Sequence, residues 1–206
     1  MTRTLLIYFC VLFCWQAASS QQAFRVQFKE SSKINIRGTT TINNFEFEQR
    51  GSDFENRELW LTTRRTNERR TEIAGHRFGL RIRNFSSDDL LAQKAFYAMM
   101  REQEHPRLFV ILKEVVASKT TESVYRGLAK VELIITGKTG IYEIPVSSIF
   151  KNGNWNMKGQ TRLTIRDFGI TPPHALMGLL QVSEWIDISL DLDCHIEPAS
   201  TELAGK

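Results

Sequence analysis

Hydrophobic and polar residues alternate strictly near the C-terminal end of the chain. Between Ile186 and Ile196 every second side chain is apolar, and the side chains between them are polar or charged. A period of two predicts a β-strand with one buried face and one solvated face. The apolar set is Ile186, Ile188, Leu190, Leu192, Cys194 and Ile196, and the polar set is Asp187, Ser189, Asp191, Asp193 and His195.

The same period recurs upstream, from Tyr125 to Ile135 and again from Tyr142 to Val146. The residues between these two runs include Gly-Lys-Thr-Gly at 137–140, which has the chemistry of a turn, so we predict a hairpin. Further strands are predicted at 58–64, 78–83, 108–116 and 160–166.

A change of parity marks the N-terminal part. Ile34, Ile36 and Ile42 occupy even positions, whereas Phe45 and Phe47 occupy odd ones. A β-bulge near residues 43–44 would place both sets on the same face, and we predict one there.

One segment follows a helical period instead. Residues 86–89, Ser-Ser-Asp-Asp, form an N-cap signal, and Leu91, Ala95, Ala98 and Met99 then recur at helical spacing. The dipeptide 105–106, His-Pro, ends this segment. Many strands, one helix and no flexible linker predict an all-β antiparallel barrel or sandwich whose helix covers one opening, because the strand edges must be hidden.

The first twenty residues predict an export signal: Arg3, an apolar run from Leu5 to Trp15, and small residues at 17–20. The run is about half the roughly 20 residues that a membrane anchor needs. A lipoprotein acylated at Cys14 is an alternative, although the bulky Phe13 precedes that cysteine. We expect residues 1–20 to be a signal peptide cleaved near Gln21, residues 21–206 to form one domain, and the protein to be periplasmic or secreted, with no transmembrane span when mature.

Composition narrows the function classes. The net charge of +4 is too small to predict a nucleic-acid partner. Basic residues concentrate in Arg64-Arg65 and Arg69-Arg70, which predict either a solvated hairpin tip or a rim that meets anionic headgroups. With Cys10 and Cys14 in the signal, Cys194 stands alone and no disulfide is expected.

We find no pattern that predicts a catalyst, a metal site or a cofactor. The four histidines, His76, His105, His174 and His195, lie at spacings that match no metal motif. Asp167-Phe168-Gly169 resembles the metal-binding triplet of kinases, but the other kinase motifs are missing. We therefore expect a protein that is not an enzyme.

The chain resembles the YceI-like family through short motifs in a fixed order. Early on these are 36–40, Ile-Arg-Gly-Thr-Thr, with Phe45, and then Phe96, Met99, Met100, Pro106 and Phe109. They continue with 125–128, Tyr-Arg-Gly-Leu, and 135–139, Ile-Thr-Gly-Lys-Thr. The last are 167–173, Asp-Phe-Gly-Ile-Thr-Pro-Pro, followed by Met177-Gly178, Val182 and the terminal strand.

This resemblance implies an eight-stranded antiparallel lipocalin-like barrel that holds a polyisoprenoid or another long-chain lipid, and it implies no catalytic residues. The long arginine-rich segment 64–77 departs from the family pattern. We expect the ligand to be lined by Ile36, Phe45, Phe47, Phe109, Ile111, Ala129, Val131, Leu133, Ile135, Ile144, Leu163, Ile165, Ile186, Ile188 and Leu190. The polar candidates at the mouth are Arg64, Arg65, Arg126 and Arg166.

Interior volume separates two hypotheses. Eight strands enclose an interior that side chains can fill, or that can admit one small ligand. Gly127 and Ala129 would leave space, whereas Ile186 and Ile188 are bulky. The alternative to a lipid carrier is therefore a filled barrel that acts through its loops or outer face, with Trp60 or Trp155 as anchors. A homodimer is compatible with either hypothesis.

Overall fold

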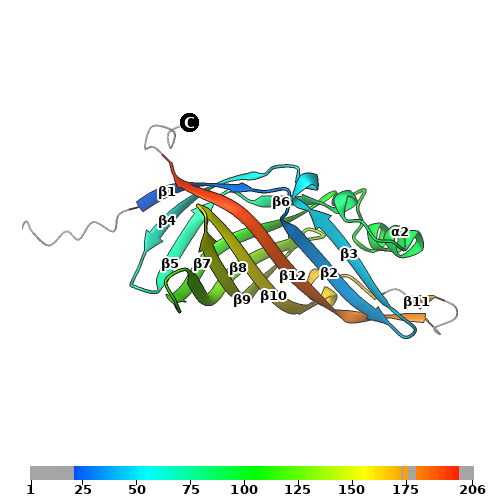
Figure 1. The fold of residues 1–206 in the computed structure, drawn as a ribbon. Coiled ribbons are helices and arrows are strands. Elements are labelled where there is room, and N and C mark those ends of the chain that lie inside the picture. Colours follow the sequence, from blue (N-terminus) through cyan, green and yellow to red (C-terminus); the bar gives the residue numbers. More distant parts are fainter. Residues whose placement is uncertain (1–20, 173, 176–179, 200–206) are drawn as a thin grey trace, which may run out of the picture.

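The computed structural model describes residues 21–172, 174–175 and 180–199. The predicted export signal, with Cys10 and Cys14, lies outside the described residues, as do Pro173, Met177 and Gly178. Within the described part, one long antiparallel sheet closes on itself (Figure 1).

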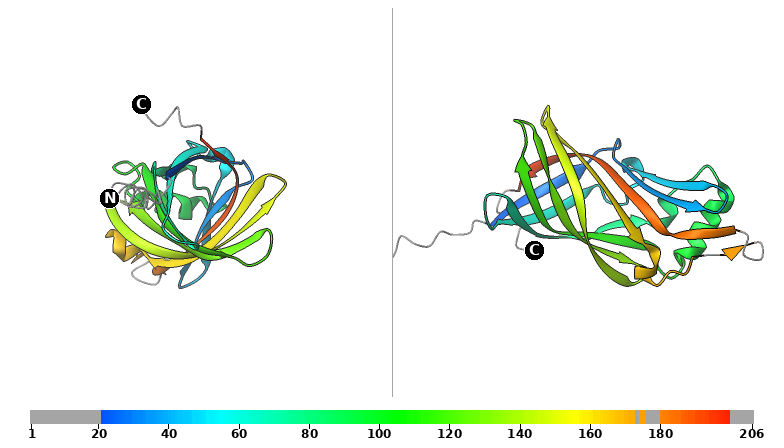
Figure 2. Two further views of the ribbon diagram at one scale, coloured as in Figure 1. Left: turned by 90° about the vertical axis from the view of Figure 1, so that its left-hand side faces the viewer. Right: turned by 90° about the horizontal axis from the view of Figure 1, so that it is seen from below.

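Eight strands form the closed ring, in the spatial order β1-β4-β5-β7-β8-β9-β10-β12, and β12 pairs back to β1. The predicted eight-stranded antiparallel barrel with one α-helix is confirmed, and Figure 2 shows the ring seen along its length. The strands are β1 (Gln21–Phe28), β4 (Glu58–Arg65), β5 (Arg70–Gly75), β7 (Arg107–Lys119), β8 (Val124–Ile135), β9 (Lys138–Lys151), β10 (Asn154–Thr164) and β12 (Leu180–Pro198).

Two strands of the ring, β12 and β7, are long enough to extend past it. The 19-residue β12 pairs with β1 over 194–198 and with β2 (Lys33–Thr40) over 182–191. In the same way, β7 pairs with β5 over 114–116 and with β6 (Phe78–Arg81) over 107–110. One end of the tube is therefore walled by β2, β3 (Asn44–Arg50) and β6 in place of β1, β4 and β5.

The lengthened end is closed between β3 and the segment after β6 by a single bridge. Glu48 and Ser86 each donate a backbone N–H to the carbonyl oxygen of the other, both at 2.9 Å. The 3-10 helix η2 (Ile82–Asn84) precedes Ser86, so a short irregular stretch completes the wall here.

The segment predicted to carry a β-bulge is instead a hairpin. β2 and β3 pair antiparallel through a turn at 41–43, with Ile36 opposite Phe47 and Gly38 opposite Phe45. Residues directly opposite on antiparallel strands share a face, so the two parities meet because the chain reverses between them. The bulge prediction was wrong, and the shared inward face that it was meant to explain is present.

The predicted helix is α2 (Leu90–Met99), which lies at the lengthened end of the barrel (Figure 1). Asp89 caps it, because its carboxylate accepts the N–H groups of Leu91 and Ala92 at 2.8 and 3.0 Å. The Tyr97 hydroxyl lies 3.1 Å from the carbonyl oxygen of Arg83 and 3.0 Å from that of Phe85, which ties the helix to η2.

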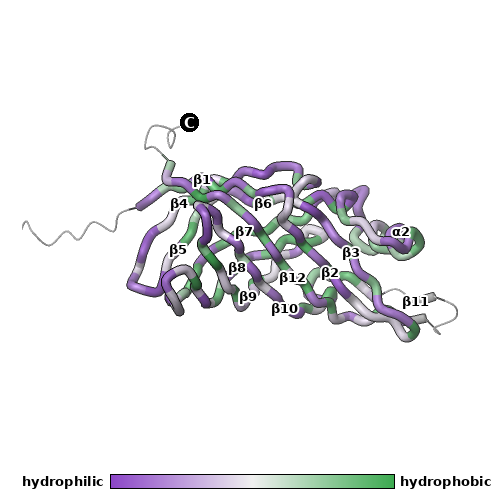
Figure 3. The backbone as a smooth tube through the Cα atoms, viewed as in Figure 1, coloured by the Kyte–Doolittle hydropathy of each residue, from purple (hydrophilic) through white to green (hydrophobic). Residues whose placement is uncertain are grey.

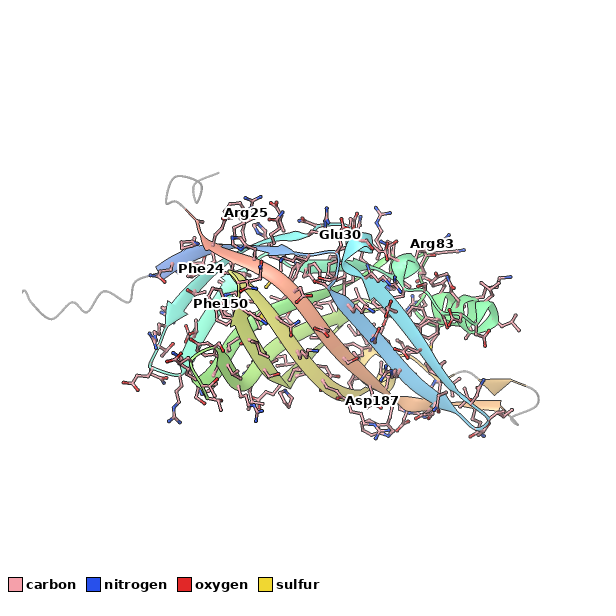
Figure 4. All side chains as sticks on the ribbon, in the orientation of Figure 1. Phe24, Arg25, Glu30, Arg83, Phe150 and Asp187 are labelled. Atoms are coloured by element: carbon pink, nitrogen blue, oxygen red, sulfur yellow. The ribbon has the colours of Figure 1, made fainter. Side chains whose placement is uncertain are left out.

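Alternation along the strands produces the core. Charged side chains lie on the outside, as Figure 4 shows for Arg25, Glu30, Arg83 and Asp187. The side chains of Ile82, Phe85 and Cys194 have no exposed surface, and Leu163 is 1% exposed. The basic cluster at 64–70 lies at the tip of the β4–β5 hairpin, where all of its residues are exposed.

Truncating an inward side chain should cost far more stability than truncating an outward one of the same type. We expect Leu163→Ala to lower the free energy of unfolding by about 2–5 kcal/mol, because it leaves a cavity. Leu128 is 44% exposed on β8, and Leu128→Ala should cost less than about 1 kcal/mol. Urea unfolding of the two variants measures both values, and equal losses would contradict the assignment of faces.

Candidate functional site

An apolar cavity of about 100 Å³ lies inside the lengthened end of the barrel. Phe96, Met99 and Met100 close it from the side of α2. The short helix η3 (Ile165–Phe168) contributes Ile165 and Phe168. The cavity is thus covered by the two segments that leave the barrel wall.

Thr161 is the one polar residue among those that line this cavity, and none of them is charged. The barrel wall supplies Ile34, Ile36, Phe45, Phe47, Leu80, Leu108, Val110, Val131, Leu133, Ile135, Ile144, Thr161, Leu163, Ile186, Ile188 and Leu190, and the connecting segments add Phe85 and Ile170. Such a surface can bind a hydrocarbon, and it offers nothing to a charged substrate.

Most of the predicted lining residues meet at this cavity. The twelve that do are Ile36, Phe45, Phe47, Val131, Leu133, Ile135, Ile144, Leu163, Ile165, Ile186, Ile188 and Leu190. Ala129 is buried, but it does not line the cavity. Contact between these predicted lining residues and a ligand stays a prediction.

Phe109 and Ile111 point the other way. On β7 the cavity is lined by Leu108 and Val110, and successive strand residues face opposite sides. Phe109 lies on the outer side, where the guanidinium of Arg77 stands 5.7 Å from its ring centre. Residues 108–112 are all apolar, so alternation in the sequence could not show which of them face the interior.

The four arginines proposed for the mouth do not come together. Arg64 forms an ion pair with Glu72, and Arg65 donates to the carbonyl oxygens of Asn67 and Glu68 at the β4–β5 tip. Arg126 is on the outer face of β8. Arg166 belongs to η3 at the other end of the barrel, where it pairs with Glu184. None of the four lines the apolar cavity.

The prediction of lining residues named Ile165 but missed the other residues of the covering segments. Phe96 stacks on Phe47 with ring centres 4.2 Å apart, and this contact holds α2 against β3. Met99, Met100 and Phe168 complete the cover. The repeated apolar residues before Pro106 were the available signal, but the period alone does not tell which helix face is buried.

Glycine shapes one side of the cavity. A side chain at Gly38 would clash with Phe45, since an added Cβ would stand 2.2 Å from the Cζ atom of that ring. The ring of Phe45 therefore lies across the bare backbone of the neighbouring strand. A larger residue at position 38 would push this ring away from its place in the cavity wall.

Polar contacts hold η3 in place outside the cavity. The Tyr142 hydroxyl donates to the carboxylate of Asp167 at 2.7 Å, and burial raises the pKa of this phenol together with that contact. The Thr136 hydroxyl donates to the carbonyl oxygen of Phe168 at 2.6 Å. These bonds fix the turn on which Phe168 closes the barrel.

A second hollow, of about 500 Å³, lies on the outer wall across β8, β9, β10, β12 and β2. It is polar, and Lys158 and Asp191 pair across it at 2.8 Å. Its lining residues are Lys33, Asn35, Arg126, Pro145, Val146, Ser147, Lys158, Gly159, Gln160, Ser189, Leu190 and Asp191.

Among the described residues, no group of three or more histidine, cysteine, aspartate or glutamate side chains is placed to hold a metal ion. No helix in the described part of the chain is long and apolar enough to cross a bilayer. The two tryptophans considered as anchors are both half-buried: Trp60 lies under Arg25, and Trp155 packs with Tyr125 and Phe150.

No protein-family model and no curated protein matches this sequence. Solved structures do match its fold. A polyisoprenoid-binding domain from Saccharophagus degradans, implicated in plant cell wall breakdown, is 7% identical, with a TM-score of 0.56 over 85% of this chain and 99% of that chain. BcnA from Burkholderia cenocepacia is 11% identical over 79% and 95% of the two chains, with a TM-score of 0.48. The YCEI protein of Campylobacter jejuni is 9% identical over 85% and 84%, with a TM-score of 0.46.

The predicted resemblance is thereby confirmed as a resemblance of fold.

The reactivity of the Cys194 thiol measures how well the barrel wall excludes water. Burial raises the pKa of its thiol to about 12, and nearby Asp193 adds to the shift. We expect iodoacetamide to modify Cys194 at least a hundredfold more slowly in native protein than in urea, because the thiolate is the reactive form. A similar rate in both states would mean that water reaches this wall.

The same thiol should make stability depend on pH. Its pKa is higher in the folded than in the unfolded state, so unfolding releases a proton above about pH 9, and the free energy of unfolding falls as the pH rises further. In urea titrations between pH 8 and 11, this fall should be steeper for wild type than for Cys194→Ala. Parallel curves would contradict a buried neutral thiol.

Proposed function

We propose that this chain, which has the YceI-like fold, is an exported lipid-binding protein that holds a polyisoprenoid or a similar long apolar chain in the barrel. The observation that carries the proposal is the cavity beneath α2, whose lining includes no charged side chain. It is the kind of site that a hydrocarbon fills and water leaves. The match in fold to a polyisoprenoid-binding domain supports the same ligand class.

The energetics suit such a ligand. Each buried methylene contributes about 0.8 kcal/mol, so a few isoprene units suffice to offset the cost of association. A cavity without charged side chains, in which Thr161 is the one polar residue, discriminates between chains by length and width. Branched isoprenoids and straight acyl chains differ in width, and the packed aromatic side chains Phe45, Phe47 and Phe96 would distinguish them.

Binding a long chain requires the cavity to widen. Its volume of about 100 Å³ is below the roughly 300–1,000 Å³ of typical ligand pockets. Met99 and Met100 are unbranched and flexible, and methionine adapts to irregular contacts more readily than branched residues do. We infer that α2 and its two methionines move when the ligand enters, while the strands keep their register.

Export belongs to the same proposal. Residues 1–20 would direct the chain out of the cytoplasm and be cleaved near Gln21, leaving residues 21–206 as the mature barrel in the periplasm or outside the cell. A long apolar chain is poorly soluble in water. A protein that encloses it would allow it to move through the aqueous compartment outside the cytoplasm. The proposal assigns no catalytic step and no nucleic-acid partner to the chain.

The small cavity favours one alternative, a filled barrel that acts through its outer surface. The polar hollow on the outer wall, with Lys33, Arg126 and Lys158, is where such a protein would meet a partner. A homodimer would also use an outer face. Ligand content separates the two functions.

Native mass spectrometry of protein purified from membrane-containing cells is the deciding measurement. We expect a stoichiometric lipid on the wild type and at least a tenfold lower occupancy on Val131→Trp, because the indole fills the cavity that Val131 lines. Ile111→Trp is the matched control, since Ile111 lies on β7 beside β8 and does not line the cavity, and it should keep the lipid. No lipid on repeated wild-type preparations, with a filled interior in a crystal, would overturn the carrier in favour of the filled barrel.

A further inference from the structure

The lengthened end of the barrel carries large apolar side chains in water. Ile42, in the turn between β2 and β3, is 72% exposed. Leu90 and Leu91, in the first turn of α2, are 71% and 77% exposed. Both elements project at the same end of the molecule (Figures 1 and 2), and Figure 3 shows hydrophobic residues on both. We call these three residues the apolar tip.

The outward face of α2 is unusual for a helix on a protein surface. Leu91, Lys94, Ala95 and Ala98 follow one another at helical spacing, and all are exposed. Such a face is normally polar, and a helix that is apolar on both sides is normally covered on both. The inner side of α2 is covered by the barrel through Phe96 and Met100, whereas no described part of the chain covers its apolar outer side.

We propose that the apolar tip docks this end of the barrel onto a lipid bilayer, where the carried chain is loaded and released. The inference rests on the proposed function. It follows from the shape of the tip, because a hairpin turn and a helix end are projections that can enter a bilayer, whereas a stable dimer needs roughly 800 Å² of matched surface on each partner. It also follows from position, because the helix that presents Leu90 and Leu91 outward closes the cavity inward with Phe96.

The charges at this end fit a bilayer surface. The turn and its flanks, residues 38–45, contain no charged side chain. Lys94, the one charge on the exposed face of α2, forms no ion pair within the described residues, and a lysine can extend its ammonium to the headgroups while its stem stays among apolar groups. Asp88 and Asp89 precede the helix, and the carboxylate of Asp89 is engaged as its cap. Docking should therefore be driven by apolar burial and need no anionic lipid.

Co-sedimentation with vesicles tests this inference. The probes are vesicles of phosphatidylcholine alone and of phosphatidylcholine with phosphatidylglycerol at about three to one. We expect wild-type protein to bind both, with little change on raising the salt, and the double variant Ile42→Glu, Leu91→Glu to bind at least tenfold more weakly. Both positions are exposed, so the variant should keep the circular dichroism spectrum and the unfolding midpoint of the wild type.

The matched control is Ile149→Glu on β9, an exposed isoleucine near the other end of the barrel, which should bind vesicles as the wild type does. Docking is overturned if the wild type does not sediment with either vesicle, or if the control loses binding as fully as the double variant. A dimer in analytical ultracentrifugation that Leu91→Glu dissociates, without vesicle binding, would also overturn it and assign the tip to a second copy.

Lipid content, measured on the same preparations, separates this inference from the function on which it rests. Protein that carries a stoichiometric lipid but ignores vesicles contradicts the docking surface alone. Protein that binds vesicles through the tip but never retains a lipid contradicts the carrier alone.

Discussion

The pairing of one edge of β12 with two different strands is the constraint on which the rest of the molecule depends. Its C-terminal part joins β1 and closes the eight-stranded ring, and its N-terminal part joins β2 and extends the wall past that ring. Because β7 is shared in the same manner by β5 and β6, the extension is walled on both sides. The barrel thereby becomes a longer tube, and the cavity lies in the added length.

The extended end cannot close by strand pairing alone. Within the described residues, the isolated bridge between Glu48 and Ser86 links β3 to the wall that continues through β6, and the opening beyond it needs a separate cover. α2 and η3 supply that cover with aromatic and methionine side chains. The wall is held by backbone hydrogen bonds between paired strands, whereas the cover is held by side-chain packing and a few polar contacts. The movement that we propose for ligand entry therefore involves the cover.

Strand parity could be predicted from the sequence in the long runs that have one polar face. Alternation from Ile186 to Ile196 and from Tyr125 to Ile135 gave strands whose inward residues the structure confirms. It failed at 108–112, where both faces are apolar, and at 43–44, where a change of parity has two causes that look alike in sequence. The strands β1 and β5 were not predicted as separate elements, although in β1 the apolar Phe24, Val26 and Phe28 alternate with Arg25 and Gln27. Asn152 and Gly153 form the turn before β10 with positive φ angles. Asn-Gly is a common hairpin dipeptide, so the sequence contained a signal for this turn.

The helix shows why the site was harder to predict than the fold. Leu91, Ala95 and Ala98 had the spacing of a buried stripe, yet they face outward, and Phe96 and Met100 are the residues that face the barrel. Local periodicity records that a face is apolar, and it does not record what covers that face. When both sides of a helix are apolar, both faces are expected to be buried. In α2 the barrel covers one of these faces and leaves the other exposed. The other face then has to be covered from outside the chain, and in the docking that we propose a lipid bilayer covers it.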